Sequence, residues 1–254
     1  VHAAATRAPL ARARMPFAPP ARMAFERVPA ELELQQRGRA ALEMITNAVR
    51  AAGQDVAASH ALGSMADLLP AITLGDPDES GSTSTSLTAI VPVVNAAQGI
   101  LVSGQTSGSS SITLASTLCP NVRDVCGFTP GAAAVIVDES GDFDVFVVSA
   151  TNAGARRLTP DRALSRAYPA GSVVVEIEAN SFRLDEQADG SFSLMRETAA
   201  GAVQPIADFL SSLSFTFDNQ RLEIALTVMP PIGTLQEAIA GREFRTSIRL
   251  RNAR

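Results

Sequence analysis

The sequence predicts an α+β fold in which one amphipathic helix near the start of the chain packs on an antiparallel β-sheet. Apolar residues recur at steps of three and four over residues 31–53, which is the period of a helix with one buried face. Over residues 69–254, short runs of alternating apolar and polar residues are typical of strands with one covered face. With 254 residues, the chain is long enough for one large domain. We therefore expect an irregular lead-in over residues 1–30 and one globular domain over residues 31–254.

The lead-in is rich in alanine, arginine and proline, and its prolines are expected to interrupt any long helix. It is locally basic, because only Glu26 opposes five arginines: Arg7, Arg12, Arg14, Arg22 and Arg27. Two interpretations stay open: a solvated tail, or a segment that contacts a membrane surface or a partner. The chain begins with Val1 rather than methionine, so an upstream piece is expected to have been removed.

The predicted helix over residues 31–53 has one apolar stripe, formed by Gly38, Leu42, Ile45, Val49 and Ala52. We expect Leu42, Ile45 and Val49 to pack against the sheet, and Gly53 to end the helix. The charged residues Arg37, Arg39, Glu43 and Arg50 fall mainly outside the stripe and are predicted to face solvent. Arg39 and Glu43 have the spacing of an ion pair on that side.

Residues 76–86 form a predicted polar loop. Its start resembles that of a calcium-binding loop, but Leu87 stands where such a loop needs a bidentate glutamate, so a loop without calcium is favoured. The strands are expected at 87–94, 99–103, 111–117, 132–138, 143–149, 172–184, 192–196, 221–228 and 244–250. The turns at 139–141 and 189–190 predict two hairpins.

The two cysteines, Cys119 and Cys126, are separated by a turn-forming Pro-Asn sequence, which favours a disulfide. A disulfide would imply an exported protein, whereas the alternative is a pair of buried free thiols in a cytosolic protein. Zinc is disfavoured because the only histidines, His2 and His60, are distant in sequence.

Residues that could carry catalysis are scarce. No nucleophile elbow is present and no histidine follows His60, which argues against a serine hydrolase and against histidine acid–base catalysis. The carboxylate pairs Asp142/Asp144 and Glu176/Glu178 are interpreted as solvated strand faces rather than a glycosidase pair. No phosphate-binding or dinucleotide motif occurs. We therefore predict a protein that is not an enzyme, without a cofactor, a metal or a small-molecule substrate.

The overall charge and composition also limit the partners. The net charge of −5 gives no electrostatic reason to bind nucleic acid, and an aromatic content of 5% leaves few side chains for base stacking. No apolar run approaches the roughly 18 residues needed to cross a bilayer.

Four segments, in this order, resemble the PilW-like minor pilins of type IV pilus systems, which are related to the J-type pseudopilins of type II secretion. The first is the helix at residues 34–53, with the spacing R-x-A-L-x-x-I-x-x-x-V-R-x-A-G. The others are the hairpin VIVDESGDFDVFVVSA, the strand region AYPAGSVVVEIEANSFRLDE and the ending FRTSIRLRNAR. Together the four segments cover about half of the chain.

This resemblance implies a pilin-like fold and a structural subunit of a pilus or pseudopilus that contributes to assembly or to the tip. The partners would be other pilin or pseudopilin subunits, contacted through the exposed side of the helix at Arg37, Arg39, Glu43 and Arg50. The family's apolar N-terminal helix, which anchors it in the inner membrane, is absent from the sequence, and Val1 looks like the residue after it. The protein would then lie at the periplasmic face of the inner membrane or in a surface pilus.

Residues 57–118 match no part of the family, and a different class of function stays open. The alternative is a secreted binding domain or adhesin whose Gly/Ser loops, such as residues 106–110, contact the ligand.

Overall fold

The computed structural model describes residues 19–54, 71–75, 82–93, 97–115, 125–231 and 240–250. The protein is mostly β, and the described residues contain one helix of 36 residues and 13 strands. The predicted α+β class is therefore wrong. The strands form one large, curled antiparallel sheet rather than a small layer under a helix.

In chain order the elements are α1 (Pro19–Gln54), β1 (Ile72–Gly75), β2 (Thr83–Ser84), β3 (Ser86–Pro92), β4 (Gln98–Ile100), β5 (Ile112–Thr113), β6 (Ala133–Val137), β7 (Phe143–Asn152), β8 (Arg157–Pro160), β9 (Val173–Glu186), β10 (Phe192–Thr198), β11 (Val203–Asp218), β12 (Arg221–Val228) and β13 (Arg242–Arg249). The predicted hairpins at 139–141 and 189–190 are confirmed by the antiparallel pairs β6–β7 and β9–β10. The last two predicted strands correspond to β12 and β13, which also pair in antiparallel fashion.

Helix α1 begins at Pro19 rather than at residue 31, so the expectation of an irregular lead-in fails for residues 19–30. Pro29 lies inside the helix, where it cannot donate a backbone hydrogen bond. The turn that follows Pro29 is held by packing, because Ala30 and Leu34 are each only 3% exposed. Burial of one helix face thus offsets the local cost of Pro29, and the helix continues past this residue.

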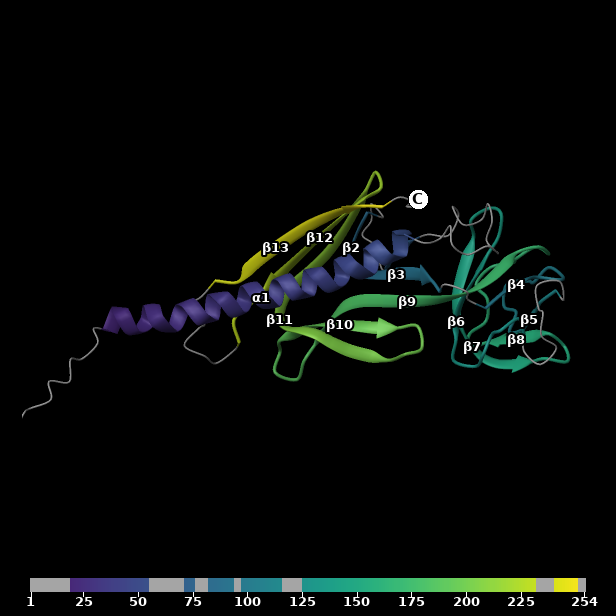
Figure 1. The fold of residues 1–254 in the computed structure, drawn as a ribbon, viewed down its shortest axis with the longest axis horizontal. Coiled ribbons are helices and arrows are strands. Elements are labelled where there is room, and N and C mark those ends of the chain that lie inside the picture. Colours follow the sequence, from purple (N-terminus) through teal and green to yellow (C-terminus); the bar gives the residue numbers. More distant parts are fainter. Residues whose placement is uncertain are drawn as a thin grey trace, which may run out of the picture.

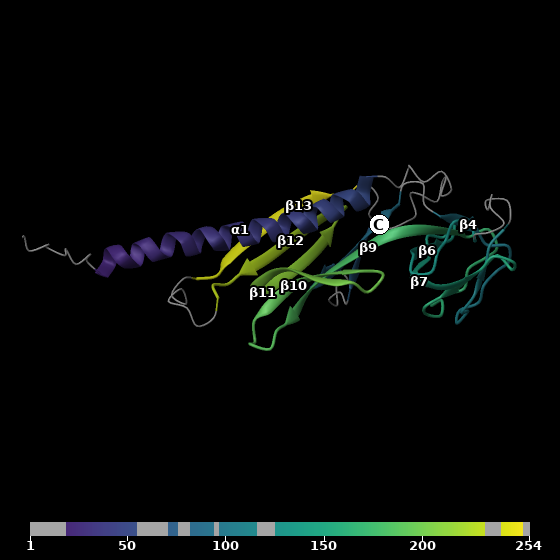
Figure 2. The ribbon, with the colours of Figure 1, turned by 60° about the horizontal axis from the view of Figure 1, so that its bottom comes forward.

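The main core lies between α1 and the strands beneath it. Figures 1 and 2 show α1 running along the sheet, and its residues contact β3, β11, β12 and β13. Ile45 and Val49 are fully buried, whereas Leu42 is only partly buried at the rim of this core. The helix therefore faces the sheet slightly differently from the predicted stripe, with the small Ala41 at the buried centre.

Gly38 allows the close contact between α1 and β13. A Cβ atom at this position would lie 2.3 Å from Cε2 of Phe244, which is far inside van der Waals contact. The aromatic ring of Phe244 therefore occupies the space that any other residue at position 38 would need.

Strand β9 joins two parts of the molecule. Its C-terminal half pairs with β3 and β10, beneath the helix, and its N-terminal half pairs with β4 and β6. From β6 the pairing continues through β7 and β8 to β5, and a bridge between Leu114 and Leu101 returns it to the end of β4. Six antiparallel strands thus close into a small barrel, which lies beyond the C-terminal end of α1 in Figures 1 and 2. Because the barrel is closed, the two strands at its edges, β4 and β5, lie against each other through this bridge.

The barrel also explains the continuous apolar runs in β6 and β9. Along β6, Ala134 and Ile136 lie in the barrel core, while Val135 and Val137 lie in a second cluster with Ile90 and Ile177. Because both faces of this strand are buried, alternation with polar residues is lost.

Candidate functional site

Arg37, predicted to face neighbouring subunits, is engaged within the molecule. Its side chain is 16% exposed, and its Nη2 lies 2.6 Å from Oε1 of Glu33 on the same helix. Its Nη1 donates to the carbonyl of Asp208 at 3.5 Å, and its guanidinium lies 5.3 Å from the centre of the Phe209 ring. Arg37 therefore fastens α1 to β11.

Phe209 has an unusual backbone conformation, with φ of 59°, next to an irregularity in the β11–β12 pairing. Such a conformation is costly for a bulky residue and persists only where surrounding contacts enforce it. Those contacts are the Arg37 guanidinium on the ring and a 2.6 Å hydrogen bond from the Met229 amide to the Phe209 carbonyl.

Arg39, Glu43 and Arg50 are exposed on α1, as predicted. The expected ion pair between Arg39 and Glu43 does not form, and within the described ranges neither side chain has a hydrogen-bond or ion-pair partner. These three charges are therefore accessible on the outer side of the helix.

A groove of about 490 Å³ runs between the exposed side of α1 and the neighbouring strands. Its apolar surface comes from Ala40, Met44, Ala48 and Ala51 of the helix and from Val91 and Phe182 of the sheet. Met44 is 39% exposed, which is high for a large apolar side chain. We call this feature the α1 groove.

Three charged side chains line the α1 groove: Glu43, Glu178 and Arg196. Nε of Arg196 donates to Oδ1 of the buried Asn180 at 2.7 Å. Glu43 and Glu178 have no hydrogen-bond or ion-pair partner within the described part of the chain. The groove thus offers two unpaired carboxylates and a guanidinium bound only to a neutral amide.

A second groove, of about 580 Å³, lies between β7 and the strands β3, β9 and β10. Its charges are already satisfied internally. Arg183 pairs with Glu197 and, at 2.8 Å, with Asp185, and the hydrogen bond that Arg183 donates to Glu197 is the main reason that the pKa of Arg183 is raised. Asp161 accepts a 2.8 Å hydrogen bond from the Val147 amide. These groups connect neighbouring strands.

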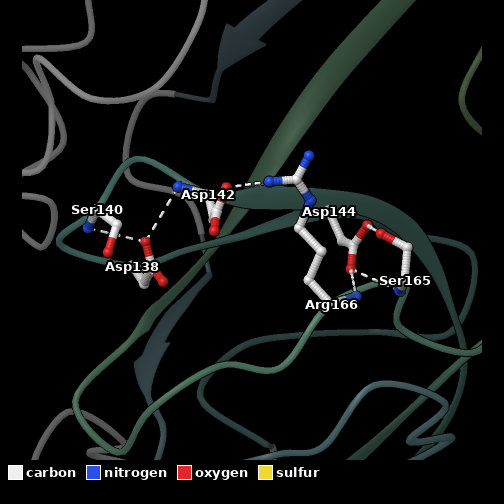
Figure 3. Close-up of polar contacts among 6 residues, drawn as sticks. All are labelled: Asp138, Ser140, Asp142, Asp144, Ser165 and Arg166. Carbon is white, nitrogen blue, oxygen red and sulfur yellow. Dashed lines mark hydrogen bonds and ion pairs between the residues drawn. The ribbon is translucent and has the colours of Figure 1, made fainter.

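The acidic residues around the β6–β7 turn form a polar cluster that organises the turn (Figure 3). Oδ1 of Asp138 accepts hydrogen bonds from the amides of Ser140 and Asp142, at 2.9 and 3.0 Å. Asp142 pairs with Arg166, and Asp144 accepts the Ser165 amide at 2.8 Å and its hydroxyl at 2.5 Å. Asp142 and Asp144 therefore have separate structural partners.

Tyr168, the only tyrosine, lies close to this cluster and inside the barrel core. It is 1% exposed, and its hydroxyl has no hydrogen-bond partner among the described residues. Burial, followed by the negative charge of Asp144, raises the pKa of Tyr168 above its ordinary value of 10.0. The raised pKa favours the protonated phenol.

The Gly/Ser run at residues 106–110 is tied to the segment 164–168. The Gly108 amide donates to the Leu164 carbonyl at 2.8 Å, and the Ser107 hydroxyl donates to the Ser165 carbonyl at 3.0 Å.

Two sequence predictions lie partly outside the described residues. Cys119 lies outside them, so its disulfide with the buried Cys126 stays a prediction. Residues 76–81, the start of the predicted polar loop, also lie outside them, so this part of the loop stays a prediction too.

The described part of the chain contains no group of three or more histidine, cysteine, aspartate or glutamate residues that could hold a metal ion. Within the same ranges, α1 is not apolar enough to cross a membrane.

Comparison of the chain with models of known protein families finds no match, and neither does comparison with curated proteins. The function is therefore inferred from the arrangement of the helix, the sheet and the charged groups.

Proposed function

We propose that this protein is a structural subunit of a filament, a minor pilin of a type IV pilus or of a related secretion pseudopilus. The observation that supports this proposal best is the form of α1. One face of its C-terminal part packs on an antiparallel sheet, and its N-terminal turns run past the end of the sheet (Figures 1 and 2). On this projecting part, Val28 is 67% exposed and Leu32 is 53% exposed.

The segments that resemble the PilW-like minor pilins correspond to the helix and to long strands of the sheet. They fall on α1, on the β6–β7 hairpin, on β9 and on β13. In a pilin the helix would continue into an apolar anchor, the globular part would lie on the periplasmic side of the inner membrane, and the exposed helix face would contact other subunits.

The polar groups also support a structural role. The carboxylates around the β6–β7 turn and in the groove beside β7 bind amides, hydroxyls and guanidiniums of this same chain. Groups bound in this way stabilise strands and turns, whereas catalysis needs a group free to exchange a proton or attack a substrate.

Deletion of the gene in its native host, followed by electron microscopy of surface filaments, tests the proposal. We expect fewer or shorter filaments, restoration by the intact gene, and the protein itself in sheared filament fractions. The coding sequence upstream of Val1 should encode an apolar segment of about 20 residues. Unchanged filaments and secretion in the deletion strain, together with a cleavable secretory signal upstream, would refute the proposal.

A secreted binding domain is the second candidate, and one observation favours it. The closed barrel lies at the end of the molecule away from the helix start (Figure 1), and exposed serines of the Gly/Ser run lie on it. A subunit that presents such a barrel at a filament tip could also bind a ligand. Adhesion that is lost in the deletion strain while filaments remain normal would favour this role.

A further inference from the structure

Strand β13 is the last strand on one side of the sheet, and no strand among the described residues lies beyond it (Figure 1). We propose that β13 of one copy pairs antiparallel with β13 of a second copy, so that two molecules share one continuous sheet around a two-fold axis. This inference goes beyond the proposed filament role and does not rest on it.

The first reason is the row of backbone groups at this edge. The Leu250 amide donates to the Gln220 carbonyl at 2.8 Å, in the register of the β12–β13 pair. Because the residues of an antiparallel pair alternate between bonding toward the partner and away from it, the even-numbered residues of β13 bond to β12. The amides and carbonyls of four odd-numbered residues therefore point outward: Glu243, Arg245, Ser247 and Arg249. Such an edge is a template for another strand.

The second reason is that the charges of β13 complement each other in this pairing. Antiparallel pairing centred on Thr246 overlaps the whole of residues 242–250 and places outward-pointing residues opposite each other. Glu243 of each copy then lies opposite Arg249 of the other, and Arg245 lies opposite Ser247. Arg249 has no hydrogen-bond or ion-pair partner within the described ranges. Glu243 binds Arg245 of its own chain at 2.7 Å, but at 50% exposure its carboxylate stays accessible to a second guanidinium.

The third reason is the apolar face of the same strand. In this register Phe244 of each copy lies opposite Ile248 of the other. Ile248 is 7% exposed and belongs to the core beneath α1, and Phe244 is partly buried beside it. These are non-hydrogen-bonded positions, where facing side chains come closest. The pairing therefore extends the core of each molecule into the other.

Charge also disfavours the two nearest registers that use the outward-pointing groups. Pairing centred on Arg245 places this residue opposite itself, and pairing centred on Ser247 places Arg245 opposite Arg249. Like charges directly opposite each other destabilise a strand pair. The arginines that protect the edge from random pairing thus select one register.

The two-fold axis fixes the direction of the helices. The α1 helices of the two copies lie on the same face of the shared sheet and run in opposite directions. In a filament whose subunits all point one way, two neighbours cannot adopt this arrangement. The dimer is therefore a state of the chain outside the filament.

Sedimentation velocity of the purified chain from micromolar to millimolar concentrations tests the inference. We expect a reversible equilibrium that stops at a dimer, because pairing uses up the free edge. Glu243→Arg and Arg249→Glu should each weaken dimerisation by about tenfold or more, since each places like charges opposite one another twice. An equimolar mixture of the two variants should recover dimerisation, because positions 243 and 249 of one variant then face opposite charges in the other.

The matched control is Glu223→Arg on β12. Glu223 also pairs with Arg245, at 3.2 Å, but it lies one strand away from the edge, so dimerisation should be unchanged. Ser247→Pro removes an outward-pointing amide and should prevent pairing, while the ladder with β12 stays intact. Circular dichroism and thermal melts establish that every variant is folded.

Cross-linking tests the register. Thr246 lies on the two-fold axis, where facing Cα atoms of a non-hydrogen-bonded pair are about 4.5 Å apart, within the range of a disulfide. Under mild oxidation, Thr246→Cys should form a covalent dimer, whereas Ser247→Cys, which lies opposite Arg245, should not. The unsubstituted chain is the control for the native cysteines.

A chain that stays monomeric at millimolar concentration, association beyond a dimer, a mixture that fails to recover, or equal cross-linking at positions 246 and 247 would each overturn the inference. None of these results bears on the filament role, which the deletion strain tests separately. Conversely, a dimer with these properties together with normal filaments in the deletion strain would uphold the β13 contact and refute the pilus role.

Discussion

Single residues of this protein combine tight packing with unusual environments, and Tyr168 is the clearest case. Its hydroxyl is buried and has no hydrogen-bond partner among the residues that the structure describes, and its pKa is raised by burial and by the charge of Asp144. A raised pKa in the folded state means that the native protein keeps this proton while the unfolded chain releases it above pH 10. The contribution of Tyr168 to stability is therefore present below pH 10 and is lost as the pH rises above it.

We predict that the native protein shows no tyrosinate absorbance at pH values where free tyrosine has ionised. The signal is unambiguous because the sequence contains one tyrosine and no tryptophan. In Tyr168→Phe, the free energy of unfolding should fall less steeply with pH in the alkaline range. Ionisation of the native protein with a midpoint near pH 10 would contradict the buried environment.

A second prediction concerns Gly38. Gly38→Ala should lower the free energy of unfolding by about 1–2 kcal/mol, because the new methyl group overlaps the Phe244 ring and overpacking outweighs the better helix propensity of alanine. Gly154→Ala is the control, since its Cβ meets only Oδ1 of Asn152 at 3.6 Å, and the change should stay within about 0.5 kcal/mol. In a Phe244→Leu background, Gly38→Ala should be neutral or stabilising, as measured by urea denaturation. Equal costs in both backgrounds would show that the ring is not the cause.

Arg37 illustrates what sequence periodicity misses at this scale. Its position outside the apolar stripe predicted a solvent-facing charge, but a long arginine side chain can lie along an apolar surface and reach a neighbouring element. Its partners, Asp208 and Phe209, are far away in sequence and are brought near only by the fold. No local pattern at residues 31–53 could have shown them.

At the scale of elements, the stability of α1 should depend on its buried face. Ile45→Asp should lower the free energy of unfolding by about 4 kcal/mol or more, because it places an unpaired charge at a fully buried position. Leu42→Asp should cost less, since Leu42 lies at the partly buried rim, where a carboxylate can reach water. Asn47→Asp on the exposed side should change stability by no more than about 0.5 kcal/mol. Thermal melts that rank Leu42→Asp as the more harmful change would refute this orientation of the helix.

The helix and the main hairpins could be predicted because their patterns of apolar residues extend over many positions and because turn-forming residues separate the paired strands. The start of α1 could not, because its prolines suggested an irregular segment. Pro19 and Pro20 lie in the first turn, where a missing amide proton costs nothing. Pro29 is retained inside the helix because packing of the following turn offsets its local cost.

At the scale of the whole molecule, the predicted fold class was wrong because the sequence pattern does not show which strands pair, although strands were expected at 99–103 and 111–117, where β4 and β5 lie. β2, β4 and β5 have two or three residues each, yet β4 and β5 are needed to close the barrel. The closure depends on the Leu101–Leu114 bridge, a contact set by the path of the chain rather than by local composition. The α1 groove likewise depends on residues from α1, β3, β9 and β10 that no motif connects.

The separate cores of the barrel and of the helix-covered sheet lead to a prediction about local unfolding. Phe146→Ala in the barrel should cost about 3–5 kcal/mol, and so should Phe215→Ala beneath the helix. In hydrogen exchange, Phe146→Ala should lower the protection of amides mainly in β4–β8, and Phe215→Ala should lower it mainly in α1 and β11–β13, because cooperative units follow contiguous cores. Uniform loss of protection in both variants would mean that the molecule opens as a single unit.

The sharing of β9 between the barrel and the sheet has a mechanical consequence. A pull on the barrel, directed away from the helix, reaches the rest of the molecule through the chain connection from β3 to β4 and through β9 with its ladders to β3 and β10. Since hydrogen bonds between antiparallel strands run across the strand direction, such a tension loads many of them together in shear instead of opening them one by one. The fold is therefore suited to bearing force along its length.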